Sequence, residues 1–232
     1  ALPISPLDDP LPVARWLAQT LARGRTPVLF TFPGSAVQVA LAARRHNLDI
    51  AGARFLISGE PITAARLATI RAAGAVPLPR YGSMETGAIG YGCTNPKSPD
   101  DVHLLSHRLA VIQDNGALFI TALDPRSPFL LLNVSMGDHA RLERRPCGCP
   151  WEALGLDTHL SHIRSHEKLT GGGVTFLGAE VIDLLERVLP EATGGAPTDF
   201  QLAEAEGPSG EPLLRLRVHP RLGPVDEARL AA

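Results

Sequence analysis

Two strand–helix–strand units follow one another near the start of the chain, and no other feature of the sequence constrains the fold as strongly. The strands are expected at 28–32, 55–58 and 76–78, and the helices between them at 36–45 and 63–73. Consecutive units of this kind form a parallel sheet with helices packed against its faces. Ser35 and Thr63 are expected to cap these helices, and a further helix at 11–21 precedes them.

The pattern changes beyond Pro96. Strands are predicted at 104–112, 117–121 and 129–134, with an Asp-Asn-Gly turn at 114–116 between the first two. This pattern indicates an antiparallel β meander. The polar stretch 164–176 contains three consecutive glycines, which leave the backbone loosely restrained, so we place a domain boundary there.

We therefore expect an α/β fold in two parts. Residues 1–163 would hold the parallel sheet with its helices and the antiparallel meander, and residues 164–232 would form a hinge and a small C-terminal α+β domain. The elements expected in the small domain are a helix at 179–188, a loop at 191–197, strands at 200–204 and 213–218, and the start of a helix at 224.

Charge and apolar patterning exclude several classes of partner. The 22 basic and 24 acidic residues are interspersed and give a formal net charge of −2, so there is no basic stripe for nucleic acid. The apolar runs are far shorter than the roughly 20 residues of a membrane-spanning helix. Three cysteines make a poor disulfide framework, and the first residues do not resemble a secretory signal. We expect a cytoplasmic protein without a nucleic-acid or membrane partner.

The segment 81–87, Tyr-Gly-Ser-Met-Glu-Thr-Gly, is the sharpest motif. It follows the predicted strand at 76–78, and a Ser-Gly-Glu-Pro loop at 58–61 follows the preceding strand. Ligands of open α/β sheets bind beyond the carboxyl ends of the strands, where such loops offer N–H groups, hydroxyls and a carboxylate. A nucleotide site is one interpretation of these loops. A glycine-rich turn from strand to helix without a ligand is the other.

These loops resemble those of the adenylate-forming superfamily, and most closely its phenylacetate–CoA ligase branch. The turn at 81–85 follows the Gly-Glu-Pro loop at the family's separation. The segment 136–139, Met-Gly-Asp-His, resembles the family's ribose motif, and 163–168, Ile-Arg-Ser-His-Glu-Lys, resembles its hinge. The resemblance covers nearly the whole chain. It implies a ligase that activates a carboxylic acid with ATP and transfers the acyl group to a thiol.

The resemblance also implies a role for each matching residue. Glu85 would hold Mg²⁺ against the ATP phosphates, Asp138 would bind both ribose hydroxyls, and Arg164 would support the ribose from the hinge. The residues implied to flank the rest of the nucleotide are Ser58, Gly59, Glu60, Pro61, Tyr81, Gly82, Ser83 and Met84. The other ligands implied are coenzyme A and a small carboxylic acid, aromatic by analogy with the family.

The sequence departs from the family pattern at several points. Met84 stands where the family has a phosphate-binding Thr, Ile163 replaces the hinge Gly, and His166 with Glu167 replaces an acidic pair. The family's Ser/Thr/Gly-rich phosphate loop would precede residue 1, and its catalytic Lys would follow residue 232. Because the sequence also lacks an initiating Met, we expect a segment of a longer protein that is inactive by itself.

Cys93, His103, Cys147 and Cys149 form a second constellation. Three thiolates and one imidazole suit a closed tetrahedral Zn²⁺ site, in which the Cys-Gly-Cys turn supplies two ligands. The spacing is not that of a zinc finger, so three unpaired thiols are the alternative. His107 is the reserve ligand.

A further group of histidines carries no site in our interpretation. His159, His162 and His166 are spaced as on one helix face, but no carboxylate or thiolate at matching spacing completes a site. We interpret them as a solvated or partly buried hinge segment.

The sequence thus predicts an acid–thiol ligase that forms an acyl adenylate and passes the acyl group to coenzyme A. Two alternatives stay open. An acyl-protein synthetase would carry out the same adenylation and transfer the acyl group to a protein cysteine. A zinc-stabilised module would bind a nucleotide or a partner without chemistry, and a homodimer is compatible with each of these functions.

Overall fold

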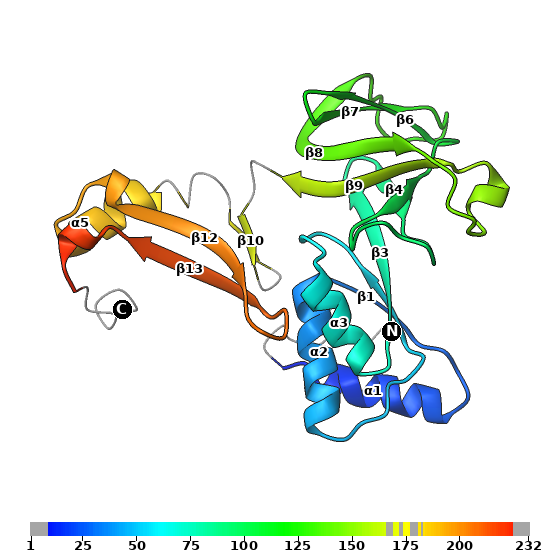
Figure 1. The fold of residues 1–232 in the computed structure, drawn as a ribbon, viewed down its shortest axis with the longest axis horizontal. Coiled ribbons are helices and arrows are strands. Elements are labelled where there is room, and N and C mark those ends of the chain that lie inside the picture. Colours follow the sequence, from blue (N-terminus) through cyan, green and yellow to red (C-terminus); the bar gives the residue numbers. More distant parts are fainter. Residues whose placement is uncertain (1–8, 166–168, 172–173, 177–180, 182, 225–232) are drawn as a thin grey trace.

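The computed structural model describes residues 9–165, 169–171, 174–176, 181 and 183–224. Its largest feature is a nine-stranded sheet with the strand order β1-β2-β3-β4-β5-β9-β8-β7-β6 (Figure 1). Two small sheets, β10-β11 and β12-β13, follow along the chain. The expected fold class is confirmed, since a helix-covered parallel sheet continues into an antiparallel meander and an α+β segment follows. Among the described residues, no helix has the length and apolar character needed to cross a membrane.

The parallel part of the sheet forms as predicted. Its elements are α1 (Leu11–Ala22), β1 (Val28–Thr31), α2 (Pro33–Arg45), β2 (Arg54–Ile57), α3 (Ala64–Ala72) and β3 (Val76–Ser83). β1 pairs with β2, and β2 pairs with β3, both in parallel. The three helices pack together against these strands, and the core between them includes Leu17, Val37, Phe55, Ile57 and Ile70.

Two local predictions for this part were wrong. β1 is not a buried strand, because it lies at the edge of the sheet, and its Phe30 side chain is 62% exposed. Ser35 does not cap α2, because the helix begins two residues earlier at Pro33, whose fixed φ suits the first helical position. Thr63 does cap α3, as predicted, and its side chain accepts the Arg66 N–H.

β3 changes the sheet from parallel to antiparallel. Its residues 76–79 pair with β2, and its residues 80–83 pair with β4 (Gly87–Tyr91) in a hairpin. The segment 81–87 therefore holds the end of β3, a tight turn at 84–86 and the first residue of β4, and the interpretation as a turn from strand to helix was wrong.

The meander continues through β5 (Val102–Leu104), β6 (Leu109–Asp114), β7 (Ala117–Ala122), β8 (Val134–Arg144), the short helix η1 (Glu152–Leu154) and β9 (Thr158–Ser165). Asn115 and Gly116 join β6 to β7 with φ values of 47° and 90°, as the Asp-Asn-Gly signal predicts. The strand predicted at 104–112 is split, because the Arg108 and Leu109 N–H groups bond back to Leu105 in a turn. The strand predicted at 129–134 begins only at Val134, and Leu130 is 97% exposed.

The C-terminal part holds β10 (Leu169–Gly171), β11 (Val174–Phe176), the π-helix η2 (Leu184–Val188), α5 (Leu189–Thr193), η3 (Pro197–Asp199), β12 (Phe200–Glu206), β13 (Pro212–Val218) and η4 (Pro220–Leu222). β10 and β11 pair antiparallel inside the stretch predicted as a glycine linker. Residues 166–168, 172–173 and 225–232, which include parts of the predicted hinge and the helix after Pro224, lie outside the described residues.

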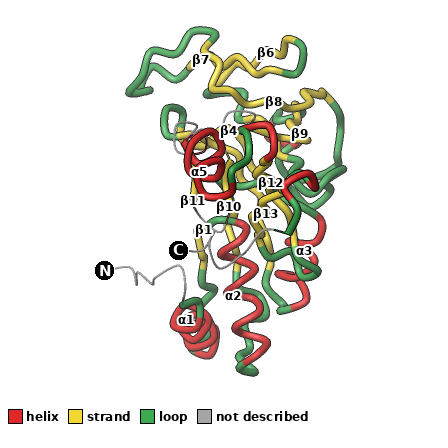
Figure 2. Tube along the Cα trace, turned by 90° about the vertical axis from the view of Figure 1, so that its left-hand side faces the viewer, coloured by secondary structure: helices red, strands yellow, loops and turns green. Residues whose placement is uncertain are grey.

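The helical segment of this part extends beyond the predicted end at 188. α5 continues to Thr193 and stops at Gly194, which has a φ of 75°. β12 and β13 form an antiparallel hairpin from Phe200↔Val218 to Glu206↔Pro212, longer than the predicted strands. We call this element the C-terminal hairpin. In Figure 1 it runs from α5 on the left toward α2 and α3, and its turn lies near these helices in both views (Figures 1 and 2).

Candidate active site and metal centre

Tyr81 and Asp138 are 57 residues apart in sequence and are hydrogen-bonded in the structure. The Tyr81 hydroxyl, at the end of β3, donates to Asp138 Oδ2 on β8 at 2.7 Å. β4, β5 and β9 separate these two strands in the sheet order, which in a flat sheet would place them roughly 19 Å apart. The sheet therefore curls, and the curl brings the two motifs together.

The raised pKa of Tyr81 keeps its hydroxyl protonated, so that it donates the hydrogen bond to Asp138. Burial raises the pKa of Tyr81 well above its ordinary value, and the Asp138 carboxylate raises it further. The phenol is therefore a permanent donor, and it holds one carboxylate oxygen in place. Asp138 itself is half-buried, so a ligand can reach the carboxylate.

Arg164 lies on the strand next to that of Asp138. In the β8–β9 pairing Asp138 faces Ser165 and His139 faces Arg164. The Arg164 guanidinium donates to the Asp100 carboxylate (3.2 Å), which also accepts the backbone N–H groups of His162 and Ile163. Asp100 was not predicted from the sequence, although it anchors the end of β9 from which Arg164 projects.

The loop 58–61 has two sides. Ser58 Oγ accepts a hydrogen bond from Arg80 (3.3 Å), the neighbour of Tyr81, so this end of the loop lies beside the Tyr81 motif. Glu60 is buried and points the other way, where its carboxylate pairs with Arg66 (3.2 Å) and accepts the Gly34 N–H (2.8 Å). The Pro61 carbonyl also accepts a bond from Arg66 (2.7 Å). The structure thus gives Glu60 a supporting position behind the loop.

The hairpin turn between β3 and β4 presents the remaining motif residues. Ser83 Oγ accepts the Thr86 N–H (3.2 Å) and lies 3.0 Å from the Thr86 hydroxyl, which closes the turn. Gly82 is required because a Cβ atom there would collide with the Gly87 carbonyl oxygen. Glu85 and Met84 lie at the exposed tip, and Met84 is 94% exposed. This tip can offer a carboxylate to a metal–phosphate group.

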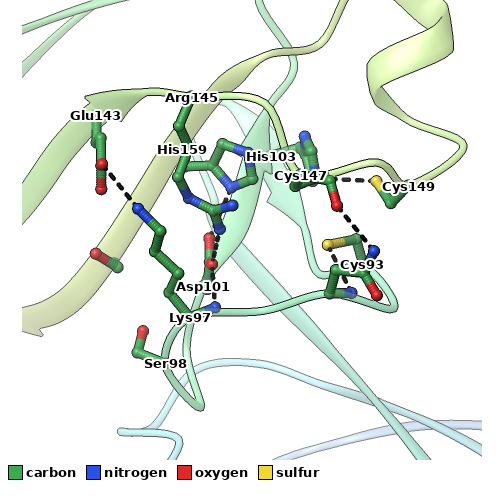
Figure 3. Close-up of polar contacts among 12 residues, drawn as sticks. Cys93, Lys97, Ser98, Asp101, His103, Glu143, Arg145, Cys147, Cys149 and His159 are labelled. Carbon is green, nitrogen blue, oxygen red and sulfur yellow. Dashed lines mark hydrogen bonds and ion pairs between the residues drawn. The ribbon is translucent and has the colours of Figure 1, made fainter.

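The second constellation gathers as the sequence predicts. The ligand atoms of Cys93, His103, Cys147 and Cys149 all lie within 4.8 Å of one another (Figure 3). His103 Nδ1 donates to the Leu156 carbonyl (2.6 Å), which directs Nε2 toward the Cys147 and Cys149 sulfurs at 3.4 and 3.2 Å. The exposed reserve ligand, His107, is not part of this group.

Hydrogen bonds hold the backbone around the cysteines in place. Gly148 has a φ of 71°, and the Glu152 carboxylate accepts the N–H groups of Cys147 and Gly148, which fixes the Cys-Gly-Cys turn. The Asn95 N–H points at Cys93 Sγ (3.4 Å). Burial and the neighbouring thiols raise the pKa of Cys93 to about 12. A bound divalent cation reverses this preference and favours the thiolates.

A network of buried polar groups supports His103. Its ring packs against the His159 ring at a centroid distance of 4.0 Å, and His159 Nδ1 bonds to Asp101 (2.8 Å). The Asp101 carboxylate also pairs with Arg145 and accepts the Lys97 N–H (2.7 Å; Figure 3). Burial raises the pKa of Asp101, but these hydrogen bonds and the Arg145 charge outweigh it and lower the pKa. Neither Asp101 nor Arg145 was predicted from the sequence.

The placement of His159 and His162 corrects the sequence prediction. Both lie on β9, a strand, and not on a helix. His159 is buried beside the cysteine cluster, while His162 is exposed and has a φ of 54°. The hydrogen bond to the Asp101 carboxylate offsets part of the cost of burying the His159 imidazole. The spacing of residues in the sequence gives no sign that Asp101 is the partner of His159. His166 lies outside the described residues.

Comparison with solved structures identifies the fold. No protein-family profile and no curated protein sequence matches this chain. Among solved structures, 2-hydroxyisobutyryl-CoA ligase in complex with an acyl-AMP is similar over 96% of the chain, with 18% identity and a TM-score of 0.55. The o-succinylbenzoate CoA synthetase of Bacillus subtilis, bound to a CoA product analogue, is similar over 94%, with 14% identity and a TM-score of 0.52.

The chain has the fold of an adenylate-forming acyl-CoA ligase. It spans about half the length of these two ligases, 48% and 46% respectively. The resemblance found in the sequence is thus confirmed at the level of the ligase fold. In this fold three of the residues implied to bind the nucleotide, Tyr81, Asp138 and Arg164, come from three strands of one curled sheet.

Proposed function

We propose that the protein containing this chain activates a carboxylic acid with ATP and transfers the acyl group to coenzyme A. The observation that carries the proposal is the hydrogen bond between Tyr81 and Asp138. It joins two motifs that the family resemblance assigns to the same nucleotide, and it forms inside a ligase-like fold. Arg164 and Ser58 lie on the elements next to this pair, so the expected nucleotide residues share one region.

Each residue has a role that its chemistry allows. The Asp138 carboxylate accepts hydrogen bonds from the two ribose hydroxyls, since a carboxylate has two acceptor oxygens suited to a diol. Tyr81 holds that carboxylate and offers its ring edge to the adenine. Arg164 supports the ribose from the end of β9, where Asp100 anchors it. Ser58, Gly59 and Pro61, together with residues 82–84, line the remainder of the nucleotide, and Glu60 supports their loop from behind.

Glu85 is the residue that would hold Mg²⁺. Its carboxylate lies at the exposed tip of the β3–β4 turn, and oxygen ligands suit a hard cation. When bound, Mg²⁺ neutralises charge on the phosphate oxygens. The substrate carboxylate then attacks the α-phosphorus of ATP, pyrophosphate leaves with the bonding electrons, and the thiol of coenzyme A later displaces AMP from the acyl adenylate.

The organisation of the enzyme is part of this proposal. Residues 1–163 belong to the large domain, and residues 164–232 form the hinge and the small domain. The substrate is a small carboxylic acid, and an aromatic acid fits the family analogy. Transfer to a protein cysteine in place of coenzyme A is the closest alternative, since adenylation is common to both. We place the enzyme in the cytoplasm, where free thiols persist.

Carboxylate-dependent ATP–pyrophosphate exchange by the full-length protein tests the proposal. Glu85→Gln should reduce the exchange rate by about tenfold or more, because a neutral amide is a poor ligand for Mg²⁺. Glu186→Gln, an exposed carboxylate in η2, is the matched control and should leave the rate unchanged. Exchange at the wild-type rate in Glu85→Gln would contradict the role of Glu85. Absence of exchange in the wild type would favour the non-catalytic module.

We propose further that Cys93, His103, Cys147 and Cys149 hold a structural Zn²⁺. Three thiols and a correctly oriented imidazole within 4.8 Å of one another match a closed four-ligand site. The ion would join the loop after β4, the strand β5 and the loop after β8, beside the stacked rings of Tyr91 and Trp151. Its role is to stabilise the fold, and no step of the ligase reaction passes through it.

A further inference from the structure

The turn of the C-terminal hairpin packs against helix α3. We call residues 206–212, between the paired ends of β12 and β13, the hairpin tip. The Thr63 hydroxyl donates to Glu206 Oε1 (2.5 Å), and the Thr69 hydroxyl donates to the Ser209 carbonyl. These bonds join residues that are far apart in sequence, with separations of 143 and 140 positions. The tip therefore docks on one side of α3.

Backbone packing supports the same contact. Gly210 has a φ of 79°, and a Cβ atom there would lie 2.7 Å from the Arg66 nitrogen and 2.9 Å from the Ala65 carbonyl carbon. Only glycine allows both the conformation and this close approach. The tip of the hairpin and the first turn of α3 are thus fitted to each other at the level of the backbone.

Arg66 connects this contact to the loop 58–61. Its Nε lies 3.1 Å from Glu206 Oε1 and 3.3 Å from the Gly210 carbonyl oxygen, both in the hairpin tip. Its Nη1 donates to Glu60 Oε2 (3.2 Å) and to the Pro61 carbonyl (2.7 Å), both in the loop. Arg66 is only 4% exposed, so its charge depends on these acceptors for compensation.

Gly34 lies next to both the loop 58–61 and the hairpin tip. Its N–H donates to Glu60 Oε2 (2.8 Å), and a Cβ atom at this position would lie 2.8 Å from Pro212 Cγ. The start of α2, the carboxylate of Glu60 and the end of the hairpin tip therefore meet at one glycine.

We propose that Arg66 is a positioning residue that links docking of the C-terminal hairpin to the conformation of the loop 58–61. When the tip is docked, Glu206 and Gly210 hold the Nε side of the guanidinium, and its Nη1 side holds Glu60 and Pro61. When the tip leaves, the buried guanidinium loses two acceptors and the loop loses a fixed support. That this loop faces a nucleotide rests on the proposed function, whereas the link itself does not.

Amide NMR with hydrogen exchange, in the absence of nucleotide, tests the link. Gly210→Ala places a methyl group against the α3 backbone and should undock the tip. Gly194→Ala is the matched control, because Gly194 lies in the same C-terminal part with a φ of 75° and a Cβ atom there would meet no atom within 4 Å. Undocking should shift the Gly34 amide resonance and make its exchange on the order of tenfold faster, since the Glu60 carboxylate that accepts it moves. The control should change neither.

A second variant keeps the link testable in case Gly210→Ala misfolds. Thr69→Val removes the hydroxyl that bonds to Ser209 and leaves Arg66 and Glu60 untouched. It should move the Gly34 resonance in the same direction by a smaller amount, while the amides of the β6–β7 hairpin stay unchanged. An unchanged Gly34 amide in every variant that keeps the β6–β7 resonances would overturn the link. Because no nucleotide is present, this result would leave the proposed function standing.

Discussion

Tyr81 places a neutral hydroxyl against a carboxylate in a buried position, and this makes stability depend on alkaline pH. Burial and Asp138 raise the pKa of Tyr81 in the folded protein above the ordinary value of 10.0. The unfolded chain releases this proton near pH 10, while the folded chain retains it. The stabilisation is therefore complete below pH 10 and is lost as the pH rises above that value.

Tyr81→Phe should reduce this alkaline loss of stability. One retained proton changes the free energy of unfolding by at most about 1.4 kcal/mol per pH unit. We expect the difference between wild type and variant to be constant below about pH 9 and to shrink toward pH 11. Urea unfolding at a series of pH values measures it. A difference that stays constant across the whole range would contradict the raised pKa.

His159 is expected to matter for stability, contrary to its interpretation from the sequence. Its imidazole is buried, bonded to Asp101 and packed on His103. His159→Ala should cost about 2–3 kcal/mol, because it leaves a hole and removes a partner of a buried carboxylate. His162→Ala, on the same strand but exposed, should cost less than about 0.5 kcal/mol. Equal midpoints of thermal unfolding for the two variants would argue against the network.

The metal centre gives a prediction for single cysteines. Protein purified without chelator should contain about one Zn²⁺ per chain. Cys147→Ser should lose the metal and lower the unfolding temperature, whereas His107→Ala should do neither, because His107 lies outside the cluster. Metal analysis and thermal unfolding check both statements. Three freely titrating thiols in metal-free protein, with an unfolding curve that a chelator does not change, would rule the site out.

At the scale of elements, the β3–β4 hairpin depends on a close backbone approach. Gly82→Ala would drive a methyl group into the Gly87 carbonyl oxygen, and backbone cannot yield as a flexible side chain can. We expect a loss of about 1–3 kcal/mol in the free energy of unfolding, together with weaker binding of AMP. Gly155→Ala, far along the chain with no atom within 4 Å, should leave AMP binding unchanged. Unfolding and calorimetric titration of both variants provide the measurement.

The elements that could be predicted from the sequence are those with local signals. The strand–helix–strand units carry apolar runs and helix formers, and the β6–β7 turn carries Asp-Asn-Gly. β8 and β9 were missed because they are polar strands: Gly137 in β8 has a φ of 75°, and β9 buries His159 beside a carboxylate from a distant turn. The apolar run 129–134 was mistaken for a strand because hydrophobicity does not show which segment finds a neighbouring strand.

The site residues also divide into those with a signal in the sequence and those without one. The family resemblance implied that Tyr81 and Asp138 serve one ligand, and the residue types predicted that Cys93, His103, Cys147 and Cys149 form one cluster. The structure brings each group together. The sequence could not show that Glu60 would turn toward Arg66, because that choice depends on the packing of α3 and the C-terminal hairpin. Residues that hold others in place, such as Asp100, have no motif of their own.

At the scale of the whole molecule, one continuous sheet contains both the parallel strands β1–β3 and the antiparallel meander that follows them. Its parallel end is covered by helices (Figure 1), and its antiparallel end curls until Asp138 of β8 accepts a hydrogen bond from the Tyr81 hydroxyl of β3. The cluster of Cys93, His103, Cys147 and Cys149 joins elements in the middle of this sheet, and the C-terminal hairpin returns to α3 at its parallel end. The proposed nucleotide site is therefore a product of the curl, with supporting clusters on both sides.

The affinity of the chain for AMP, measured by calorimetric titration, tests this central claim most directly. Asp138→Asn keeps the shape of the side chain and an acceptor for Tyr81, but it loses the charge that we propose binds the ribose hydroxyls. We expect the dissociation constant to rise by about tenfold or more, the equivalent of about 1.4 kcal/mol. Asp114→Asn, an exposed carboxylate in the β6–β7 turn, should leave it unchanged. Equal affinities for wild type and Asp138→Asn, or no binding of AMP to either, would contradict the account.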